Sequence, residues 1–283
     1  MNYRHGFHAG NFADVLKHVV LMRILTHLNA KDTPYRVIDT HAGAGRYDLG
    51  SEEALRTHEW KDGVARLDQA PLAPPVEALL KPWRDAVAGA RALYGPSAYP
   101  GSPWLCRQAM RRDDRLIAAE LHPQTHKKLV AAIGRDERCK ALAIDGWNAL
   151  RGNVPPKERR GVVLIDPPFE EKDEFATLAA ELIAAHRKWA TGIYAVWYPI
   201  KDRRAVEGLV DSVLAAGIGR LLRLEIDVDR PEAAGGLSAT GMLIVNPPWM
   251  LGDEARIILP ALSERLAQGP QPRYLCEPIR PDG

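Results

Sequence analysis

The residues best suited to chemistry are Asp166, Pro167, Pro168 and Phe169, which follow the apolar run 161–165. That run predicts a buried strand of a parallel sheet. The prolines lack an N–H donor and have a fixed φ, so they end the strand and hold the loop extended. A carboxylate, a carbonyl and an aromatic ring would then lie at a strand's carboxyl end, where open α/β sheets bind ligands. They suit a planar base whose exocyclic amine donates to the two oxygens.

Two glycines, Gly43 and Gly45, follow the first predicted strand, residues 35–39. Glycines at a strand-to-helix turn let the backbone approach a ligand closely. The dinucleotide fingerprint requires a third glycine, but Asp48 stands at that position. The glycine pair alone therefore fits a plain tight turn about as well as a binding loop.

Acidic residues end the next three predicted strands. The carboxylate of Glu120 can accept hydrogen bonds from both hydroxyls of a ribose. Asp145 and Gly146 follow the third strand, where a side chain or the backbone can contact an adenine edge. Asp166 follows the fourth. Any one of these acids alone is best explained as a solvated strand end, but four consecutive strand ends together predict a nucleoside pocket.

The elements that must position these groups alternate between strands and helices. This alternation predicts an α/β fold with a doubly wound, mostly parallel sheet of seven strands. The first helix is expected from residue 12, with Asn11 as its cap. We expect the Pro-rich tail after Gly269 to be loosely held. The seven strands are expected at 35–39, 116–121, 140–144, 162–165, 192–197, 220–228 and 240–245.

Residues 48–99 interrupt the alternation. They contain two helical patterns, around 52–67 and 82–93, separated by a Pro-rich link at 70–75. A parallel crossover needs only one helix. We therefore predict one domain, residues 1–283, that carries a small helical insertion at 48–99 after the glycine loop.

Composition limits the classes of function. The chain has 283 residues and a formal net charge of +2 from 38 basic and 36 acidic residues, so contacts to nucleic acid must come from local patches. No segment predicts a signal peptide or a membrane span. Three scattered cysteines fit neither a disulfide framework nor a zinc site. We expect a cytoplasmic protein without a metal.

Several motifs carry a resemblance to a known family. Gly-x-Gly, two strand-end acids and Asp-Pro-Pro-aromatic resemble the S-adenosylmethionine-dependent methyltransferases that modify adenine N6. At closer range the chain resembles the bacterial 23S ribosomal RNA (adenine-N6) methyltransferase J family, a class I, Rossmann-like family. The motifs lie at 3–5, 7–11, 13–18, 39–47, 99–103, 120–123, 195–199 and 246–249.

The resemblance implies roles for individual residues. It implies a substrate role for Tyr3, with Arg4 beside it, and an amine-acceptor role for Asp166. It implies stacking of the base on Phe169, where the family pattern leads us to expect Tyr, so the hydrogen bond of a tyrosine hydroxyl is absent. The implied contacts to S-adenosylmethionine are His18, His41, Gly43, Gly45, Ser102, Glu120, Asp145, Gly146 and Asp166.

The predicted reaction is methyl transfer to the N6 amine of an adenine in 23S ribosomal RNA. The Asp166 carboxylate and the Pro167 carbonyl would accept the two N–H bonds, and the base would be flipped out of the RNA to reach them. Asn246, Pro247, Pro248 and Trp249 form a second, similar tetrapeptide. Because it follows the last predicted strand, we expect it to be structural, with Trp249 packed or at the pocket rim.

Other classes of function remain open at this point. A DNA adenine-N6 methyltransferase shares Asp-Pro-Pro-aromatic, but the chain has no segment large enough for a DNA target-recognition domain. A nucleotide-binding oxidoreductase is disfavoured by the missing third glycine. A catalytically silent RNA-binding protein is disfavoured by the intact strand-end acids. We expect the enzyme to be a monomer. Without the resemblance, His18 beside Asp14 would be read as a surface pair.

Overall fold

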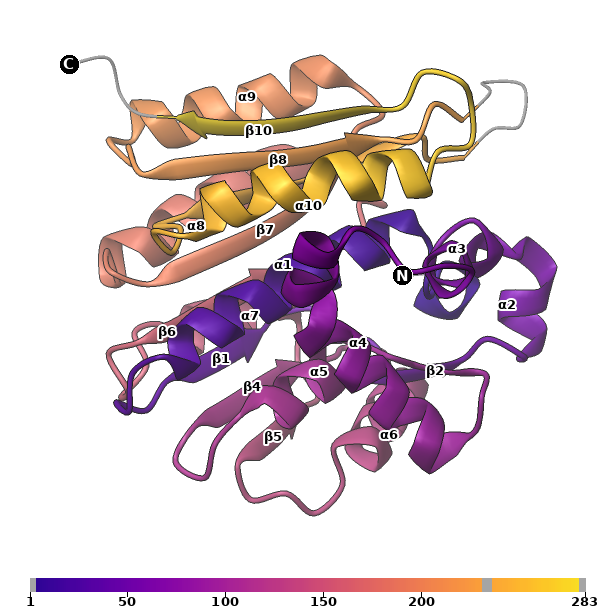
Figure 1. Ribbon diagram of the computed structural model, residues 1–283. Coiled ribbons are helices and arrows are strands. Elements are labelled where there is room, and N and C mark those ends of the chain that lie inside the picture. Colours follow the sequence, from indigo (N-terminus) through magenta and orange to yellow (C-terminus); the bar gives the residue numbers. More distant parts are fainter. Residues whose placement is uncertain (1–3, 231–235, 280–283) are drawn as a thin grey trace.

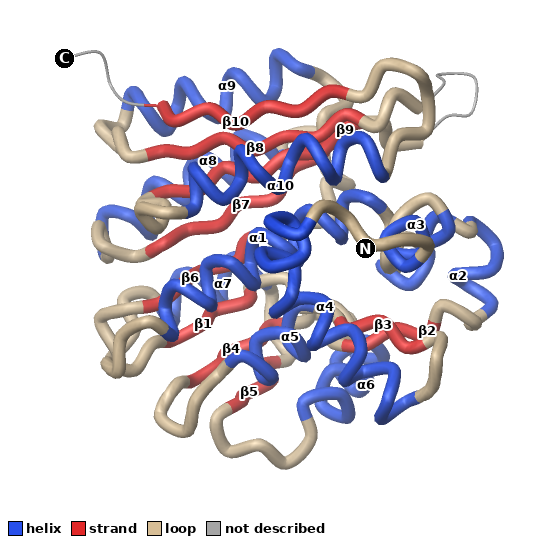
Figure 2. The backbone as a smooth tube through the Cα atoms, viewed as in Figure 1, coloured by secondary structure: helices blue, strands red, loops and turns tan. Residues whose placement is uncertain are grey.

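The computed structural model describes residues 4–230 and 236–279. Its centre is an eight-stranded sheet, and a separate two-stranded sheet pairs β2 (Arg46–Asp48) with β3 (Ala98–Pro100) (Figures 1 and 2). The strands of the main sheet are β1 (Arg36–Asp39), β4 (Arg115–Ala119), β5 (Cys139–Leu142), β6 (Gly161–Ile165), β7 (Ile193–Pro199), β8 (Leu221–Asp227), β9 (Ala239–Val245) and β10 (Arg273–Ile279).

The strand order is β10-β8-β9-β7-β6-β1-β4-β5. The five strands from β7 to β5 are parallel neighbours, whereas β9 runs antiparallel to both β7 and β8. The predicted α/β, Rossmann-like, mostly parallel sheet is therefore confirmed. The chain reverses its direction of travel across the sheet between β1 and β6, and such a switch point opens a crevice at the carboxyl ends of the strands.

The predicted strand number was one too low. β10 pairs antiparallel with β8 from Arg273, opposite Asp227, to Ile279, opposite Leu221, so residues 273–279 of the tail are held and not loose. Pro278 hid this strand from a sequence pattern, because proline is a poor candidate for a central strand. It is tolerated here because β10 is the edge strand of the sheet.

Helices cover both faces of the sheet. Alternate side chains of one strand serve opposite cores: Val162 and Leu164 belong to one, and Val163 and Ile165 to the other. The first core contains α1 (Phe12–Asn29), α4 (Pro74–Tyr94), α5 (Ser102–Ala109), α6 (Pro123–Ile133) and α10 (Leu251–Arg265). The second contains α7 (Gly146–Asn153), α8 (Glu174–Lys188) and α9 (Arg203–Ala215).

The helices between β2 and β3 occupy the region predicted as an insertion. They are α2 (Glu52–Thr57), a 3-10 turn at Glu59–Lys61, α3 (Val64–Asp68) and α4. α4 begins at Pro74, eight residues before the predicted pattern, and contains Pro82. Prolines at the first helical positions need no N–H partner, so the Pro-rich link ends in the helix itself. α4 packs against α1 and α10.

α1 is buried on nearly every side. The Asn11 Oδ1 accepts a hydrogen bond from the Asp14 backbone N–H at 2.9 Å, which confirms the predicted cap. Asp14, Lys17 and His18 are all buried, so Asp14 and His18 do not form a surface pair. Charged residues inside a buried helix need partners, and these partners lead to the site described below.

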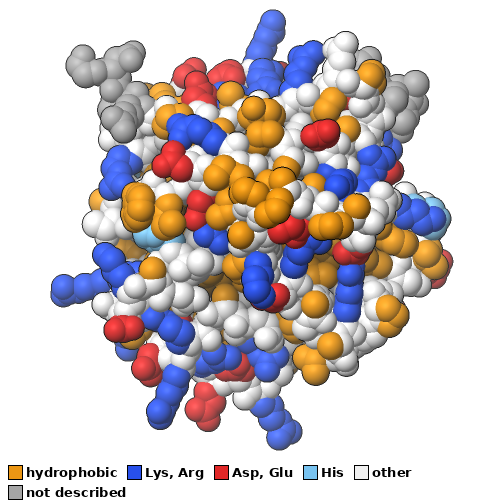
Figure 3. Space-filling view, in the orientation of Figure 1, with side chains coloured by type: hydrophobic (Ala, Val, Ile, Leu, Met, Phe, Trp, Pro, Cys, Tyr) orange, Lys and Arg blue, Asp and Glu red, His pale blue; other side chains and the backbone are white. Residues whose placement is uncertain are grey.

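The described residues also bear on other classes of protein. None of their helices has the length and hydropathy to cross a membrane. Within residues 4–230 and 236–279, no three His, Cys, Asp or Glu side chains gather as metal ligands, and the three cysteines are unbridged. On the face shown in Figure 3, basic and acidic side chains are interspersed, as expected for a net charge near zero.

Candidate active site

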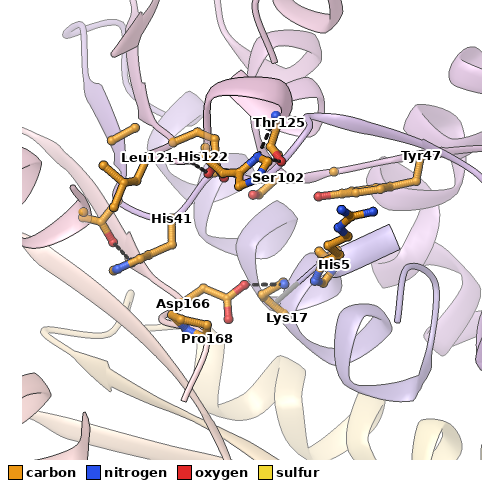
Figure 4. Close-up of a pocket in the computed structure, with 18 of the residues that line it drawn as sticks. His5, Lys17, His41, Tyr47, Ser102, Leu121, His122, Thr125, Asp166 and Pro168 are labelled. Carbon is orange, nitrogen blue, oxygen red and sulfur yellow. Dashed lines mark hydrogen bonds and ion pairs between the residues drawn. The ribbon is translucent and has the colours of Figure 1, made fainter. Parts of the chain in front are cut away.

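A pocket opens at the carboxyl ends of β1, β4 and β6, at the switch point of the sheet (Figure 4). Its empty volume, including solvent at the mouth, is about 790 Å³. Most residues predicted to contact a cofactor line it, although they come from distant parts of the chain. The predicted site residues in its lining are Arg4, His18, His41, Gly43, Ser102, Glu120, Asp145, Gly146 and Asp166.

The glycines keep the pocket open. Gly43 has φ +60°, and a Cβ there would lie 2.2 Å from the hydroxyl of Tyr47. A Cβ on Gly146 would lie 2.4 Å from the Nε2 atom of His41. Gly45, with φ +72°, does not line the pocket; its carbonyl accepts the Gly101 N–H at 2.9 Å and supports the loop from behind. Only residues without a Cβ fit these positions.

Two strand-end acids line the same wall. The Oε1 atom of Glu120 accepts the His122 backbone N–H at 2.7 Å, and burial raises the pKa of this carboxyl. The Oδ1 atom of Asp145 accepts the Asn148 N–H at 3.0 Å and caps α7. The backbone of Gly146, the first residue of α7, is thereby fixed beside the pocket. Each carboxylate can accept further hydrogen bonds, because each has two oxygens.

Two histidines that line the pocket are neutral near pH 7. Burial lowers the pKa of His18 to about 3, and its Nδ1 lies 2.9 Å from the Tyr99 hydroxyl. Burial also lowers the pKa of His41 to about 4. Its Nδ1 lies 2.8 Å from the Thr40 hydroxyl, which donates to the Leu164 carbonyl at 3.0 Å. His41 Nδ1 is therefore the donor of its pair, and Nε2 is an acceptor.

Asp166 is held by a cation that we did not include among the predicted site residues. Lys17 Nζ lies 2.5 Å from Asp166 Oδ2 (Figure 4). It also lies 2.9 Å from Asp14 Oδ1. Burial opposes the charge on Lys17, but the two carboxylates outweigh it and raise the pKa of the amine well above its usual value. The signal was present in the sequence as Asp14 and Lys17, which stand at i and i+3 of the predicted first helix.

A buried acid, Asp39, lies next to the first pocket and accepts a hydrogen bond from one of its lining residues, Ser102. Asp39, at the end of β1, is fully buried, and its Oδ2 accepts the Ser102 hydroxyl at 2.7 Å. Burial raises the pKa of Asp39 to about 7. No hydrogen bond from the described residues reaches its Oδ1. The first pocket therefore has beside it a carboxyl whose protonation changes near neutral pH.

A second pocket adjoins the first, with an empty volume of about 770 Å³. Four residues line both pockets: His5, Lys17, Asp166 and Pro168. Phe169 and Trp197 line only the second. Asp166 therefore stands on the wall between two adjoining compartments. Two ligands placed one in each would meet at this carboxylate.

The aromatic wall of the second pocket is built from three rings. Phe169 has φ +51°, which is uncommon outside glycine. Its ring lies 4.8 Å from that of Phe175 and 5.7 Å, edge-on, from that of Trp197. Trp197 was not predicted as a site residue. Pro167 is buried and, unlike Pro168, lines neither pocket.

The N-terminal segment lies at the mouth of the first pocket. Arg4 pairs with Glu53 of α2 at 3.3 Å and lines the first pocket but not the second. His5 Nε2 lies 2.9 Å from Asp14 Oδ2, so this segment joins the network around Lys17. Tyr3 lies outside the described residues.

The second tetrapeptide lies at the other end of the strands, where the parallel strands begin. β9 runs antiparallel to β7, so its end, Val245, pairs with the start of β7 at Tyr194. The Asn246 amide donates to the carbonyls of Ala190 and Gly192, each at 2.8 Å. Trp249 is 78% exposed, which corrects the expectation that it is packed or at the pocket rim.

Comparisons with known proteins give the family. The family model described as "Ribosomal RNA large subunit methyltransferase D, RlmJ" matches residues 32–275. The chain is similar to Ribosomal RNA large subunit methyltransferase J of Escherichia coli, with 39% identity over 94% of each chain. It is 37% identical to the Haemophilus influenzae protein of the same name over the whole of both chains.

A solved structure shares the fold. A Legionella pneumophila protein superposes with a TM-score of 0.85 and 30% identity, covering 96% of this chain and 98% of that one. Fold and sequence agree over nearly the full length. The chain therefore belongs to the RlmJ family of ribosomal RNA large subunit methyltransferases.

Proposed function

We propose that this enzyme transfers a methyl group from S-adenosylmethionine to the N6 amine of an adenine in 23S ribosomal RNA. The observation that carries the proposal is the position of Asp166 on the wall shared by two pockets. One pocket would hold the methyl donor and the other the flipped base. The names of the relatives support a substrate in the large ribosomal subunit.

The first pocket fits S-adenosylmethionine. When bound, this cofactor supplies a methyl group on a positively charged sulfur. Glu120 would accept the ribose hydroxyls, and the Asp145–Gly146 turn would contact the adenine edge. The absence of a Cβ at Gly43 and Gly146 leaves the space that a ligand needs. Neutral His18 and His41 line the pocket without adding positive charge to it.

The second pocket would hold the acceptor base. Lys17 forms an ion pair with Asp166 and fixes one of its oxygens, Oδ2. The remaining acceptor sites of the carboxylate would accept an N–H bond of the adenine amine. The Pro167 carbonyl, predicted as the second acceptor, lines neither pocket. The hydrogen bond to Asp166 orients the nitrogen, and the carboxylate stabilises the positive charge that develops on it before the proton leaves.

Phe169 and Trp197 would hold the ring of the base. Stacking on an aromatic side chain contributes about 1–3 kcal/mol per base. A base in a helix must leave its stack to reach this wall, which costs a few kcal/mol, and stacking here would offset part of that cost. As further proposals, the enzyme acts as a cytoplasmic monomer and uses no metal.

A labelling experiment tests the proposal. The protein is incubated with S-adenosylmethionine carrying a tritiated methyl group and either transcribed 23S RNA or duplex DNA, and the product is digested to nucleosides. We expect label in N6-methyladenosine from RNA alone, and none with Asp166→Ala. Preferential labelling of DNA would favour the alternative, a DNA adenine-N6 methyltransferase. Label on another base atom, or normal transfer by Asp166→Ala, would contradict the mechanism.

A further inference from the structure

The second pocket has polar groups that the reaction at Asp166 does not use. Its lining includes the aromatic rings of Phe169 and Trp197 and also His8, Glu59 and Lys201. These residues come from the N-terminal segment, the helical region between β2 and β3, and the loop after β7. Three separate parts of the chain thus place charged groups in one pocket, beyond the groups that an adenine ring requires.

We propose that His8 and Lys201 form a site for a backbone phosphate of the RNA strand next to the target adenine. The inference rests on the proposed function, because it assumes that an adenine lies against the aromatic wall. A base in RNA brings its ribose and phosphates with it. They must leave the pocket on the side away from Asp166, where N6 is held.

His8 is held in place by Glu59. Its Nδ1 lies 3.0 Å from both carboxylate oxygens of Glu59, and the Asn11 amide donates to Glu59 Oε2 at 2.9 Å. The hydrogen bond that His8 donates to Glu59 raises the pKa of His8. Glu59 therefore orients the ring and favours its charged form. A fixed imidazolium is a good partner for an anion, because little side-chain entropy is lost on binding.

Lys201 supplies the second positive charge. It is exposed, follows the end of β7, and lines the same pocket as His8. Within the described part of the chain, no carboxylate pairs with Lys201 in an ion pair. Among the described lining residues, His8 and Lys201 add positive charge beside Glu59, which favours an anion here. Lysine binds phosphate as a point charge without strict geometry.

The chemistry of the pocket selects a nucleic-acid phosphate over other anions. An acidic side chain of a protein could satisfy Lys201, but it would leave the aromatic wall and Asp166 without a partner. A nucleotide fills all three parts at once: the ring lies on Phe169, the amine at Asp166 and the phosphate at His8 and Lys201. Contacts of this kind position the strand and carry no sequence information.

The test measures RNA affinity and its dependence on salt. Lys201→Gln and His8→Gln are compared with wild type by filter binding of transcribed 23S RNA in the presence of S-adenosylhomocysteine. We expect each variant to bind RNA roughly three- to tenfold more weakly than wild type. The negative slope of the logarithm of the association constant against the logarithm of the salt concentration should decrease in magnitude by about 0.7–1, the value of one lost phosphate contact. The KM for RNA should rise similarly, with kcat unchanged.

Lys140→Gln is the matched control, since Lys140 is exposed on β5, the outermost strand at the other edge of the sheet. We expect its RNA affinity and salt slope to equal those of wild type. The proposal is overturned if Lys201→Gln and His8→Gln keep the wild-type slope, or if Lys140→Gln loses as much. Because binding is measured without turnover, an enzyme that binds RNA with the expected slopes but transfers no methyl group would contradict only the proposed function.

Discussion

Two tetrapeptides of nearly the same composition end two strands of one sheet. Asp166-Pro-Pro-Phe169 follows β6, and Asn246-Pro-Pro-Trp249 follows β9. Because β9 runs antiparallel to its neighbour β7, which is parallel to β6, the two loops lie at opposite ends of the strands. The Asp166 side chain faces two pockets and a buried lysine, whereas the Asn246 side chain is used to hold the carbonyls of Ala190 and Gly192. The direction of the strand, and not the loop composition, decides which one can meet a ligand.

The backbones of the two loops also differ. In the first, the left-handed residue is the aromatic one, Phe169, with φ +51°. In the second it is Asn246, with φ +53°, and asparagine tolerates this region well. The strain of the first loop therefore falls on the residue that lines the second pocket. Uncommon backbone conformations often persist where a ligand is bound.

The largest effect is expected from removing the lysine that distinguishes the first loop. Lys17→Met leaves Asp14 and Asp166 without their cation, and breaking a buried ion pair costs about 3–5 kcal/mol. We expect the free energy of unfolding in urea to fall by about that amount and methyl transfer to be lost. Lys81→Met is the control, because the exposed pair of Lys81 with Asp85 should contribute less than about 0.5 kcal/mol. Equal losses in both variants would show that Lys17 has no special role.

The next effect compares the first residues of the two loops. Asp166→Asn should lower kcat by about 10²–10³-fold, as losing one group that stabilises developing charge does in other enzymes, with S-adenosylmethionine affinity changed far less. Asn246→Ala should leave kcat unchanged per folded molecule, but lower the free energy of unfolding by about 1–3 kcal/mol, because two carbonyls lose their donor. Loss of turnover in Asn246→Ala, with turnover kept in Asp166→Asn, would reverse the assignment of the two loops.

A smaller effect is expected at the aromatic residues. Phe169→Ala should lower kcat/KM for RNA, and the fall should correspond to a loss of about 1–3 kcal/mol in transition-state stabilisation, the contribution of one stacked base. Phe169→Tyr should retain most activity, since it keeps the ring. Trp249→Ala removes an exposed side chain at the other end of the strands and should change the kcat/KM little. Steady-state kinetics at several RNA concentrations would measure all three, and equal losses at Phe169 and Trp249 would remove the distinction between the loops.

The smallest effect is a pH dependence confined to the edge that carries Asp166. The pKa of Asp39 is raised to about 7 in the folded protein, from the ordinary value of 3.8. The folded state then binds this proton more tightly than the unfolded state, so stability falls as pH rises towards 7 and levels off above it. Between pH 6 and 8 the loss is about 1 kcal/mol. Urea unfolding should show this loss in wild type and not in Asp39→Asn; an identical pH profile in both would contradict it.

Much of the site could be predicted because its signals are local. Glu120, Asp145 and Asp166 each follow a short apolar run, and the end of a strand can be read from a few residues. The Asn11 cap and the start of α1 are equally local and are confirmed. Two features were missed because they depend on contacts that no short window contains. β10 exists only through its pairing with β8, and Lys17 meets Asp166 across 149 residues of sequence.

The sequence by itself determined which groups stand at the strand ends and that the fold alternates strands with helices, because these depend on apolar periodicity and the rigidity of proline. Only the tertiary structure decided which of the two Pro-Pro loops lies at the switch-point pocket, because that depends on the order and direction of the strands. It also decided that Lys17 is a partner of Asp166 and that two pockets share the Asp166 wall. The helix and the strand are separate in sequence, and only their packing in one core brings these charges together.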